Sequence, residues 1–425
     1  MKMAPSTATL VSLLFSLTSA QKIGTTIPEH HPPLTTYKCS VANGCQAVNT
    51  SVVLDAFSRS FHSVSSPSSP CTLGSAPLCD TPESCAQNCA LEGVDYGSWG
   101  IHTKDDALTL NQWRRDPSTG RITTVSPRTY LLASDGQNYE SVTLLNAELS
   151  FDVDLSKLPC GMNGALYLSE MELDGGRGVS KGLNPAGATY GTGYCDAQCP
   201  PLSFINGAAN PSKLGACCNE MDIWEANALA TTYTPHPCSA TRIRTCDSEA
   251  TCGQPKGYCD KWGCAYNAYS HGYRDFYGRN KTVDTNRKMT VVTQFVTSNG
   301  RSDGKLADIK RVYIQDGKVI KNVVAKVGGG LQVDSMTDGY CNATATWTQE
   351  RGGIEVMGEA LARGMVLIFS LWADDGGFMN WMDSGNSGPC NDTEGNPALI
   401  VQHTPDASVT FSNIRWGEIG STFKA

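Results

Sequence analysis

Eighteen cysteines are distributed along this chain of 425 residues, and they restrict its possible folds more than any other feature. Because the number is even, nine disulfides can form with no cysteine left over, as in proteins that fold in an oxidising compartment. Closely spaced pairs such as Cys85 with Cys89 and Cys195 with Cys199 could instead bind zinc, but no pair of histidines stands near them to complete a ligand set. The cysteines therefore predict a secreted protein that is cross-linked by disulfides.

The N-terminus has the pattern of a secretory signal peptide at residues 1–20. Lys2 gives it a positive start, residues 10–17 form an apolar run too short to span a bilayer, and the small residues at 18–20 suit cleavage before Gln21. No later segment is apolar over the length of a transmembrane helix, so no membrane contact is expected. Secretion also fits four acceptor motifs for N-glycosylation, at Asn49, Asn280, Asn342 and Asn391.

Residues 21–425 are predicted to form a single domain, since no Pro/Ser/Thr-rich linker and no long repeat interrupts them. Residues 147–156 alternate apolar and polar side chains with the period of two that a half-buried strand requires. Residues 288–297, 364–373 and 408–416 are rich in β-branched and aromatic side chains, and 42 glycines and 21 prolines supply turns. The pattern predicts an all-β protein in which two large antiparallel sheets pack face to face and long loops wall a groove.

Helices are expected to be few and short. Residues 81–91 begin with Thr81 as a capping residue and Pro82 at the first helical position. Residues 352–364 place three apolar side chains on one face and end at Gly364, which predicts a second helix.

The formal charge of the chain is −8, from 33 basic and 41 acidic residues. A partner nucleic acid would need a basic face to neutralise its phosphates, so nucleic acid is not expected and an uncharged substrate fits better. No nucleotide, flavin or metal motif is present, so the sequence predicts no cofactor and no metal.

Three carboxylates lie within six residues in the segment CCNEMDIWEAN, residues 217–227. On a strand, Glu220 and Asp222 point to the same side, about 7 Å apart at ~3.3 Å per residue. Glu225 reaches that side only if one residue is inserted into the strand, so we predict a β-bulge between Asp222 and Glu225, with Met221 and Ile223 facing the core. Two carboxyl groups on one groove are what a retaining glycosidase needs, one to attack the sugar and one to donate a proton.

Three alternatives explain the cluster without catalysis. A solvated acidic edge strand fits poorly with Trp224 and with two adjacent cysteines. A helix would separate Glu220 from Glu225 by about 140° around its axis. A calcium site would need more oxygen ligands than the segment offers.

This segment resembles the catalytic stretch of glycoside hydrolase family 7, the fungal cellulases that include endoglucanases and cellobiohydrolases. The segments SFDVDLSKLPCGMNGALYLSEM, YGTGYCDAQCP, TPHPC, VVTQF, SLWADDGGFMNWMDSG and VTFSNIRWGEIGST also resemble family segments, in family order over nearly the whole mature chain. The resemblance implies a concanavalin-like β-jelly-roll sandwich that cleaves β-1,4-glucan with retention. It implies Glu220 as the nucleophile, Asp222 as its partner and Glu225 as the acid/base. His236 corresponds to a supporting histidine near the leaving-group site.

The resemblance also implies a set of sugar-binding residues. They comprise Trp372 on the non-reducing side of the cleavage point, Trp381 just beyond it, and the groove positions Arg128, Asn163, Tyr167, Asp196 and Gln198. It pairs Cys195 with Cys218, Cys199 with Cys217, and Cys160 with Cys390. The other cysteines are predicted to be disulfide-bonded with partners left open: Cys39, Cys45, Cys71, Cys79, Cys85, Cys89, Cys238, Cys246, Cys252, Cys259, Cys264 and Cys341.

Four departures from the tunnel-forming cellobiohydrolases predict an open substrate groove. Ser58 and Ser60 stand where those enzymes often carry entrance tryptophans, residues 211–215 replace a long insertion, Gly376 and Gly377 replace a roof aromatic, and residues 386–397 are short. The prediction is therefore a monomeric, secreted endo-β-1,4-glucanase. A processive cellobiohydrolase is the alternative. A lectin-like sandwich that binds glucan without cleaving it has no use for two glutamates at this spacing. The preference among cellulose, mixed-linkage β-glucan, xylan and glucomannan stays open.

Overall fold

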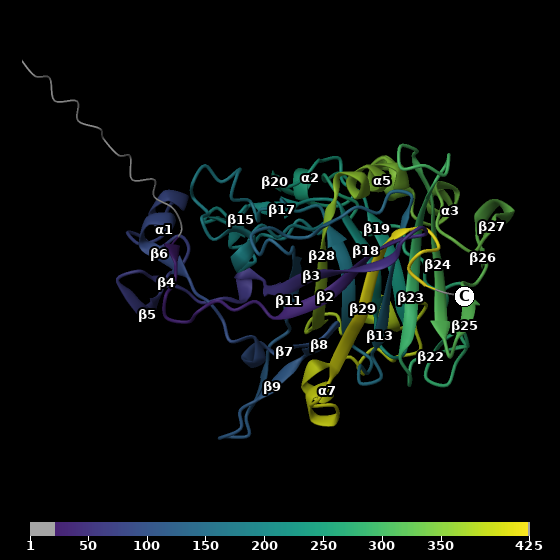
Figure 1. The fold of residues 1–425 in the computed structure, drawn as a ribbon, viewed down its shortest axis with the longest axis horizontal. Coiled ribbons are helices and arrows are strands. Elements are labelled where there is room, and N and C mark those ends of the chain that lie inside the picture. The colour runs from purple at the N-terminus through teal and green to yellow at the C-terminus, as the bar shows by residue number, and fades with distance from the viewer. Residues whose placement is uncertain (1–21, 424–425) are drawn as a thin grey trace, which may run out of the picture.

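A computed structural model describes residues 22–423 of the chain. The signal peptide predicted at residues 1–20 lies outside the described residues. Strands fill the centre of the molecule, short helices cover its upper end, and a smaller lobe extends to the left (Figure 1). The prediction of an all-β sandwich with few short helices is confirmed.

Fifteen strands form one hydrogen-bonded sheet that folds back on itself. Their order is β19 (Thr231–His236), β18 (Glu220–Ala226), β14 (Met162–Ser169), β28 (Met365–Ala373), β11 (Arg128–Leu132), β3 (Gly44–Leu54), β2 (Pro33–Ser40), β29 (Ser408–Glu418), β13 (Ala147–Asp154), β23 (Met289–Thr297), β24 (Leu306–Gln315) and β25 (Lys318–Lys321), with β7 (Ile101–Lys104), β8 (Ala107–Asn111) and β12 (Ser141–Val142) alongside. The four strand segments predicted from sequence are β13, β23, β28 and β29.

The two halves of this strand order form two layers that face each other across the core. Phe369 on β28 and Phe411 on β29 have ring centroids 5.5 Å apart, although β11, β3 and β2 separate their strands in the hydrogen-bonded order. Trp224 on β18 meets Phe151 on β13 in the same way, at 6.0 Å. The layers are thus the two predicted sheets, and the β2–β3 hairpin connects them by hydrogen bonds.

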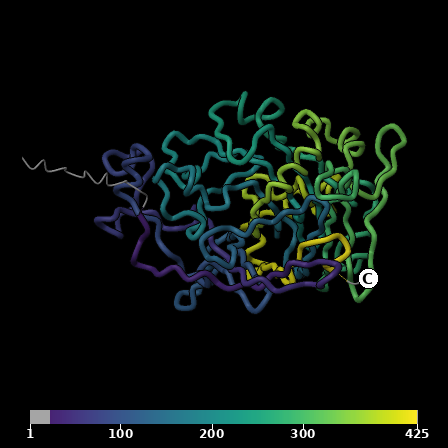
Figure 2. Tube along the Cα trace, turned by 45° about the horizontal axis from the view of Figure 1, so that its top comes forward, coloured from purple at the N-terminus to yellow at the C-terminus, as the bar shows by residue number. Residues whose placement is uncertain are grey.

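One pairing brings together distant parts of the chain. Strand β2 lies parallel to β29, with Tyr37 opposite Arg415, and the purple and yellow segments run side by side in Figures 1 and 2. The other pairings among the main strands are antiparallel, as predicted.

Both predicted helices are present. Helix α1 (Pro82–Asn88) begins after Thr81, whose side chain accepts the Ser84 N–H, and α5 (Gly353–Arg363) ends before Gly364 at φ +89°. The remaining α-helices of the described residues are α2 (Glu249–Cys252), α3 (Asp338–Thr344), α4 (Thr346–Glu350), α6 (Asn380–Asp383) and α7 (Pro397–His403).

Short strands pair outside the main sheet. A four-stranded sheet in the left lobe of Figure 1 contains β1 (Lys22–Ile23), β4 (Phe61–Ser63), β5 (Ser66–Pro70) and β6 (Cys89–Leu91). The two-stranded pairs are β9 (Trp113–Arg115) with β10 (Ile122–Thr124), β15 (Phe204–Ile205) with β16 (Ala208–Ala209), β17 (Gly215–Cys217) with β20 (Arg244–Cys246), β21 (Tyr277–Gly278) with β22 (Val283–Asp284), and β26 (Ala325–Lys326) with β27 (Gln332–Val333).

All eighteen cysteines form disulfides. The pairs are Cys39–Cys45, Cys71–Cys89, Cys79–Cys85, Cys160–Cys390, Cys195–Cys218, Cys199–Cys217, Cys238–Cys259, Cys246–Cys252 and Cys264–Cys341. They include the three pairs that the resemblance implies. The asparagines of the four predicted glycosylation motifs are exposed. Within residues 22–423, no helix combines the length and apolarity that crossing a membrane requires.

Candidate active site

A groove of about 960 Å³ crosses five neighbouring strands on the side away from the core. In order, these strands are β19, β18, β14, β28 and β11. Strand β18 carries the three carboxylates, so one arm of the groove extends toward β28 and β11 and the other toward β19. The catalytic candidates therefore lie between two sets of binding residues.

The predicted β-bulge is confirmed. Asp222 lies opposite Thr234 and Glu225 lies opposite Thr232, so three steps along β18 correspond to two along β19. The extra residue turns Glu225 to the same side as Glu220 and Asp222, and all three line the groove. Strict alternation would have sent Glu225 into the core.

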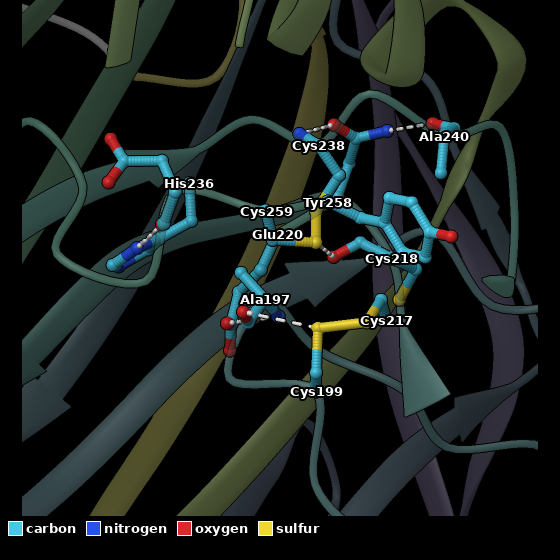
Figure 3. The surroundings of a disulfide bond; sticks show 12 residues. Ala197, Cys199, Cys217, Cys218, Glu220, His236, Cys238, Ala240, Tyr258 and Cys259 are labelled. Atoms are coloured by element: carbon cyan, nitrogen blue, oxygen red, sulfur yellow. Dashed lines mark hydrogen bonds between the residues drawn. A yellow bond between two sulfur atoms is a disulfide. The ribbon is translucent and has the colours of Figure 1, made fainter. Parts of the chain in front are cut away.

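Glu220 is held by the loop that precedes β15. The backbone N–H of Ala197 donates to Glu220 Oε2 at 3.0 Å, beside the Cys199–Cys217 disulfide (Figure 3). A second disulfide, Cys195–Cys218, ties the same loop to the residues just before β18. The two adjacent cysteines at 217 and 218 thus fasten the loop on both sides of Ala197, and the loop orients the Glu220 carboxylate.

Asp222 forms an ion pair with His236 on the neighbouring strand. The Nε2 of His236 lies 3.0 Å from Asp222 Oδ2, and its Nδ1 lies 2.8 Å from the backbone carbonyl of Asp260. A carbonyl and a carboxylate both accept hydrogen bonds, so the ring must carry two protons to satisfy both. Burial lowers the pKa of His236, but Asp222 and the Asp260 carbonyl outweigh it and raise that pKa to about 9. The His236 ring is therefore an imidazolium at neutral pH.

Asn163 lies behind Glu225 rather than on the groove surface. Its Nδ2 donates to Glu225 Oε1 at 2.9 Å, and its Oδ1 accepts the backbone N–H of Ala226 at 3.2 Å. Asn163 is fully buried, so the groove position expected for it is not where the structure places it. Both ends of its amide bond β18, and its full burial keeps it from contact with a sugar. It orients Glu225 and leaves Oε2 as the oxygen that can carry a proton.

Burial and neighbouring charge shift both glutamates in the same direction. Burial raises the pKa of Glu220 well above its usual range, and the negative charges of Asp222 and Asp196 add to the effect. Burial likewise raises the pKa of Glu225 to about 8, with Asp222 as the second cause. The charge of Glu225 also raises the pKa of Glu220, so ionisation of both carboxyls together is disfavoured and one proton can be kept at neutral pH. One acid and one base is the state that retaining hydrolysis requires.

A bell-shaped pH profile is expected for kcat/KM. The acid must be protonated, so activity falls as the pH rises through about 8, the pKa of Glu225. The nucleophile must be ionised, so activity also falls on the acid side as the two glutamates take up a second proton.

Asn163 provides the test of this assignment. Its hydrogen bond lowers the pKa of Glu225, so Asn163→Ala should move the basic limb of the profile to higher pH. Rates on an aryl cellobioside, measured across pH, check this, and a basic limb that stays in place or moves down would contradict it.

Polar groups are linked along the β11 arm of the groove. Arg128 donates to Asp55, and its guanidinium carbon lies 3.5 Å from the ring centroid of Tyr194. Tyr194 donates to Asp196 Oδ2 at 2.7 Å and lies 3.0 Å from the hydroxyl of Tyr167. All five residues line the groove, and this network holds their polar atoms in fixed positions. Sequence reasoning missed Asp55 and Tyr194.

Gln198 connects the two arms. Its Nε2 donates to the carbonyl of Lys261 at 2.8 Å, and its backbone N–H donates to Asp196 Oδ1 at 2.8 Å. Burial raises the pKa of Asp196. Both Gln198 and Asp196 line the groove beside Glu220, as the resemblance implies.

Three tryptophans present exposed surface to the groove. Trp372 on β28 is 36% exposed and Trp381 on α6 is 49% exposed. Trp262, which the sequence analysis did not single out, is 59% exposed and lies 5.6 Å from the ring of Trp347. All three of the exposed rings line the groove. Flat exposed rings are suited to stacking on the apolar faces of sugars.

The place of Trp262 follows from the glycine after it. A Cβ at Gly263 would come within 2.6 Å of the His236 ring, so the backbone passes directly against that histidine. Trp262 therefore belongs to the β19 arm, on the far side of the carboxylates from Trp372. No periodic pattern in residues 259–264 could have identified it.

The side-chain groups with metal-ligand spacing in residues 22–423 do not resemble a metal centre. They are Cys199 with Cys217 and Cys246, and Cys160 with Asp383 and Cys390. Every cysteine among them is in a disulfide, and a disulfide sulfur is not the thiolate that binds a metal.

Comparisons with known proteins agree with this geometry. The model of glycosyl hydrolase family 7 matches residues 23–423. A protein of Aspergillus terreus named probable endo-beta-1,4-glucanase celB is 54% identical over 419 residues, which cover 98% of this chain and 97% of that protein.

Two solved structures have similar folds. The native endocellulase EGI of Humicola insolens has a TM-score of 0.88 and 44% identity, and the match covers 95% of this chain and 100% of that one. A family 7 cellobiohydrolase of Daphnia pulex has a TM-score of 0.87 and 35% identity, with coverage of 95% and 100%. Endo-acting and cellobiohydrolase members therefore share this backbone, and the mode of attack depends on the groove.

Proposed function

Because the chain belongs to glycosyl hydrolase family 7, we propose that it hydrolyses internal β-1,4-glucosidic bonds of cellulose and related β-glucans with retention of configuration. The observation that carries this proposal is the bulge in β18, which turns Glu220, Asp222 and Glu225 to one groove. A protein that only binds glucan would need no such cluster of buried carboxylates.

The reaction takes two steps. Glu220 attacks the anomeric carbon while Glu225 gives its proton to the departing glycosidic oxygen, which leaves a glycosyl ester on Glu220. Glu225, now a carboxylate, takes a proton from water, and the hydroxide attacks the same carbon and releases Glu220. Two inversions give net retention. Asp222 and its imidazolium partner His236 stand beside Glu220 and orient it.

The groove surface supports internal cleavage. The rings of Trp372, Trp381 and Trp262 remain substantially exposed, so a chain can dock on them from the side. Ser58 lines the groove with a small side chain, and Gly376 and Gly377 are exposed and do not line it. A chain held by such a groove can leave after one cut.

We expect the viscosity of a soluble carboxymethyl cellulose to fall steeply while few reducing ends have formed. One cut near the middle of a polymer halves its length, whereas removal of disaccharides from an end barely shortens it. Viscosity and reducing ends are measured on the same samples. Slow viscosity loss with cellobiose as nearly the only early product would instead support the processive cellobiohydrolase.

The proposal extends to where the protein acts. The nine disulfides fit a secreted enzyme, since such bonds persist in oxidising compartments. The substrate partner is a β-1,4-glucan. The groove of this chain carries the carboxylates that the reaction needs, and we propose that the protein acts as a monomer.

A further inference from the structure

The guanidinium of Arg311 lies in the core of the sandwich, where a cation is rarely found. Arg311 stands on β24 and is only 2% exposed. None of the ion pairs among residues 22–423 involves it. Its guanidinium carbon instead lies 4.3 Å from the ring centroid of Tyr233, 5.8 Å from that of Trp224 and 5.9 Å from that of Tyr313. Burying a cation without a carboxylate is unfavourable, so its other contacts must explain its presence.

The hydrogen bonds of Arg311 lead to the catalytic strand. Its Nε donates to Thr293 Oγ1 on the adjacent strand β23 at 3.1 Å, and its Nη2 donates to the backbone carbonyl of Ile223 on β18. Strands β24 and β18 belong to opposite layers. The hydrogen bond to Ile223 therefore crosses the core and reaches the core-facing side of β18.

Ile223 lies within the bulge. It has no opposite residue in the register of β18 with β14 or in that of β18 with β19. A bulge removes the polar groups of its extra residue from the ladder, and Ile223 is fully buried, so its carbonyl cannot turn to water. Arg311 supplies the donor that this carbonyl needs.

We infer that Arg311 is a positioning residue for Glu225. Its hydrogen bond to the Ile223 carbonyl stabilises the bulge from the core side of β18. It thereby fixes the local twist that points Glu225 into the groove. Without a donor at position 311, the strand would shift or flatten the bulge to satisfy the Ile223 carbonyl. That change would displace Glu225, which follows the bulge, more than Glu220, which precedes it and is held by Ala197. The inference rests on the acid/base role proposed for Glu225.

The test is the dependence of kcat/KM on the leaving group in Arg311→Met, which removes the donor and keeps an unbranched side chain. We expect a loss of about a hundredfold on phenyl cellobioside and less than about fivefold on dinitrophenyl cellobioside, because only the phenolate of the first needs a proton to depart. The number of active molecules is counted with a fluorosugar that traps the glycosyl ester, so a partly folded sample does not distort the rates. Equal losses on both substrates would overturn the inference.

Two further variants complete the design. Thr293→Val removes the other hydrogen-bond acceptor of the same guanidinium and leaves the Ile223 bond intact, so its leaving-group dependence should equal that of the wild type. Arg311→Gln keeps an N–H as far along the side chain as the arginine Nε, so it can still donate to Thr293 but ends short of Ile223, and its leaving-group dependence should resemble that of Arg311→Met. If Arg311→Met yields no active molecules, Arg311→Gln decides, and a wild-type dependence would overturn the inference.

Glu225→Ala is measured in parallel. If it shows no leaving-group dependence, the proposed function of Glu225 fails. If it does and Arg311→Met does not, only the inference about Arg311 fails.

Discussion

Replacement of Glu220 by glutamine is expected to lower kcat/KM by about three or more orders of magnitude on every substrate. The amide has nearly the shape of the carboxyl but cannot attack the anomeric carbon. It can still accept the Ala197 N–H, so the fold should be retained. Rates on cellohexaose and on aryl cellobiosides, with the melting temperature as the control for folding, check this. A variant that retains a tenth of the activity would exclude Glu220 as the nucleophile.

Glu225→Ala separates the two carboxyl roles. On natural glucan the loss should again reach about three orders of magnitude, because the departing sugar oxygen needs a proton. On dinitrophenyl cellobioside kcat/KM should largely survive, since that leaving group departs unaided. If Glu225→Ala is no better than Glu220→Gln on this substrate, the two roles are wrongly assigned. NMR of the first product should show the β-anomer, and an α-anomer would exclude retention.

Asp222→Asn should lower kcat/KM on the order of a hundredfold, as expected for loss of a group that orients a catalytic residue. The neutral amide no longer supports the imidazolium, so the pKa of His236 should fall from its value of about 9. Asp222 also raises the pKa of Glu225, so the basic limb of the pH profile should move to lower pH, opposite to the shift in Asn163→Ala.

The two Asp222 effects are measured separately. NMR titration of His236 reports the fall in its pKa. The pH profile of kcat/KM reports the shift of the basic limb that Glu225 causes. Asp303→Asn, which neutralises an exposed turn residue, is the matched control. A full rate with an unchanged histidine titration would show that the Asp222–His236 pair has no catalytic role.

The sequence predicted the bulge because strand geometry is periodic. Glu220 and Glu225 differ by an odd number, and only one inserted residue brings both to one side. The same periodicity located β13, and β-branched and aromatic composition located the segments that form β23, β28 and β29. The local sequence pattern was therefore enough to predict that Glu220, Asp222 and Glu225 lie on one side of their strand.

Features that depend on distant segments were beyond such reasoning. Nothing in the local sequence distinguishes Arg311 from other residues of an alternating strand. Its role depends on Ile223, which the opposite layer places against it. Trp262 is a single ring in a loop whose position depends on packing against His236. Asn163 shares a side with Tyr167 on β14, yet the amide is covered because Glu225 and Ala226 engage both of its ends.

The parallel pairing of β2 with β29 has a consequence for biosynthesis. Tyr37 meets Arg415, so this contact closes a loop spanning almost the whole described chain. Such a contact is entropically slow to form and cannot form at all until the ribosome has released β29. During translation, the earlier strands must remain soluble without β29, which pairs with both β2 and β13. The yield of this protein in a production host should therefore be limited by chaperone and disulfide-isomerase capacity in the secretory pathway.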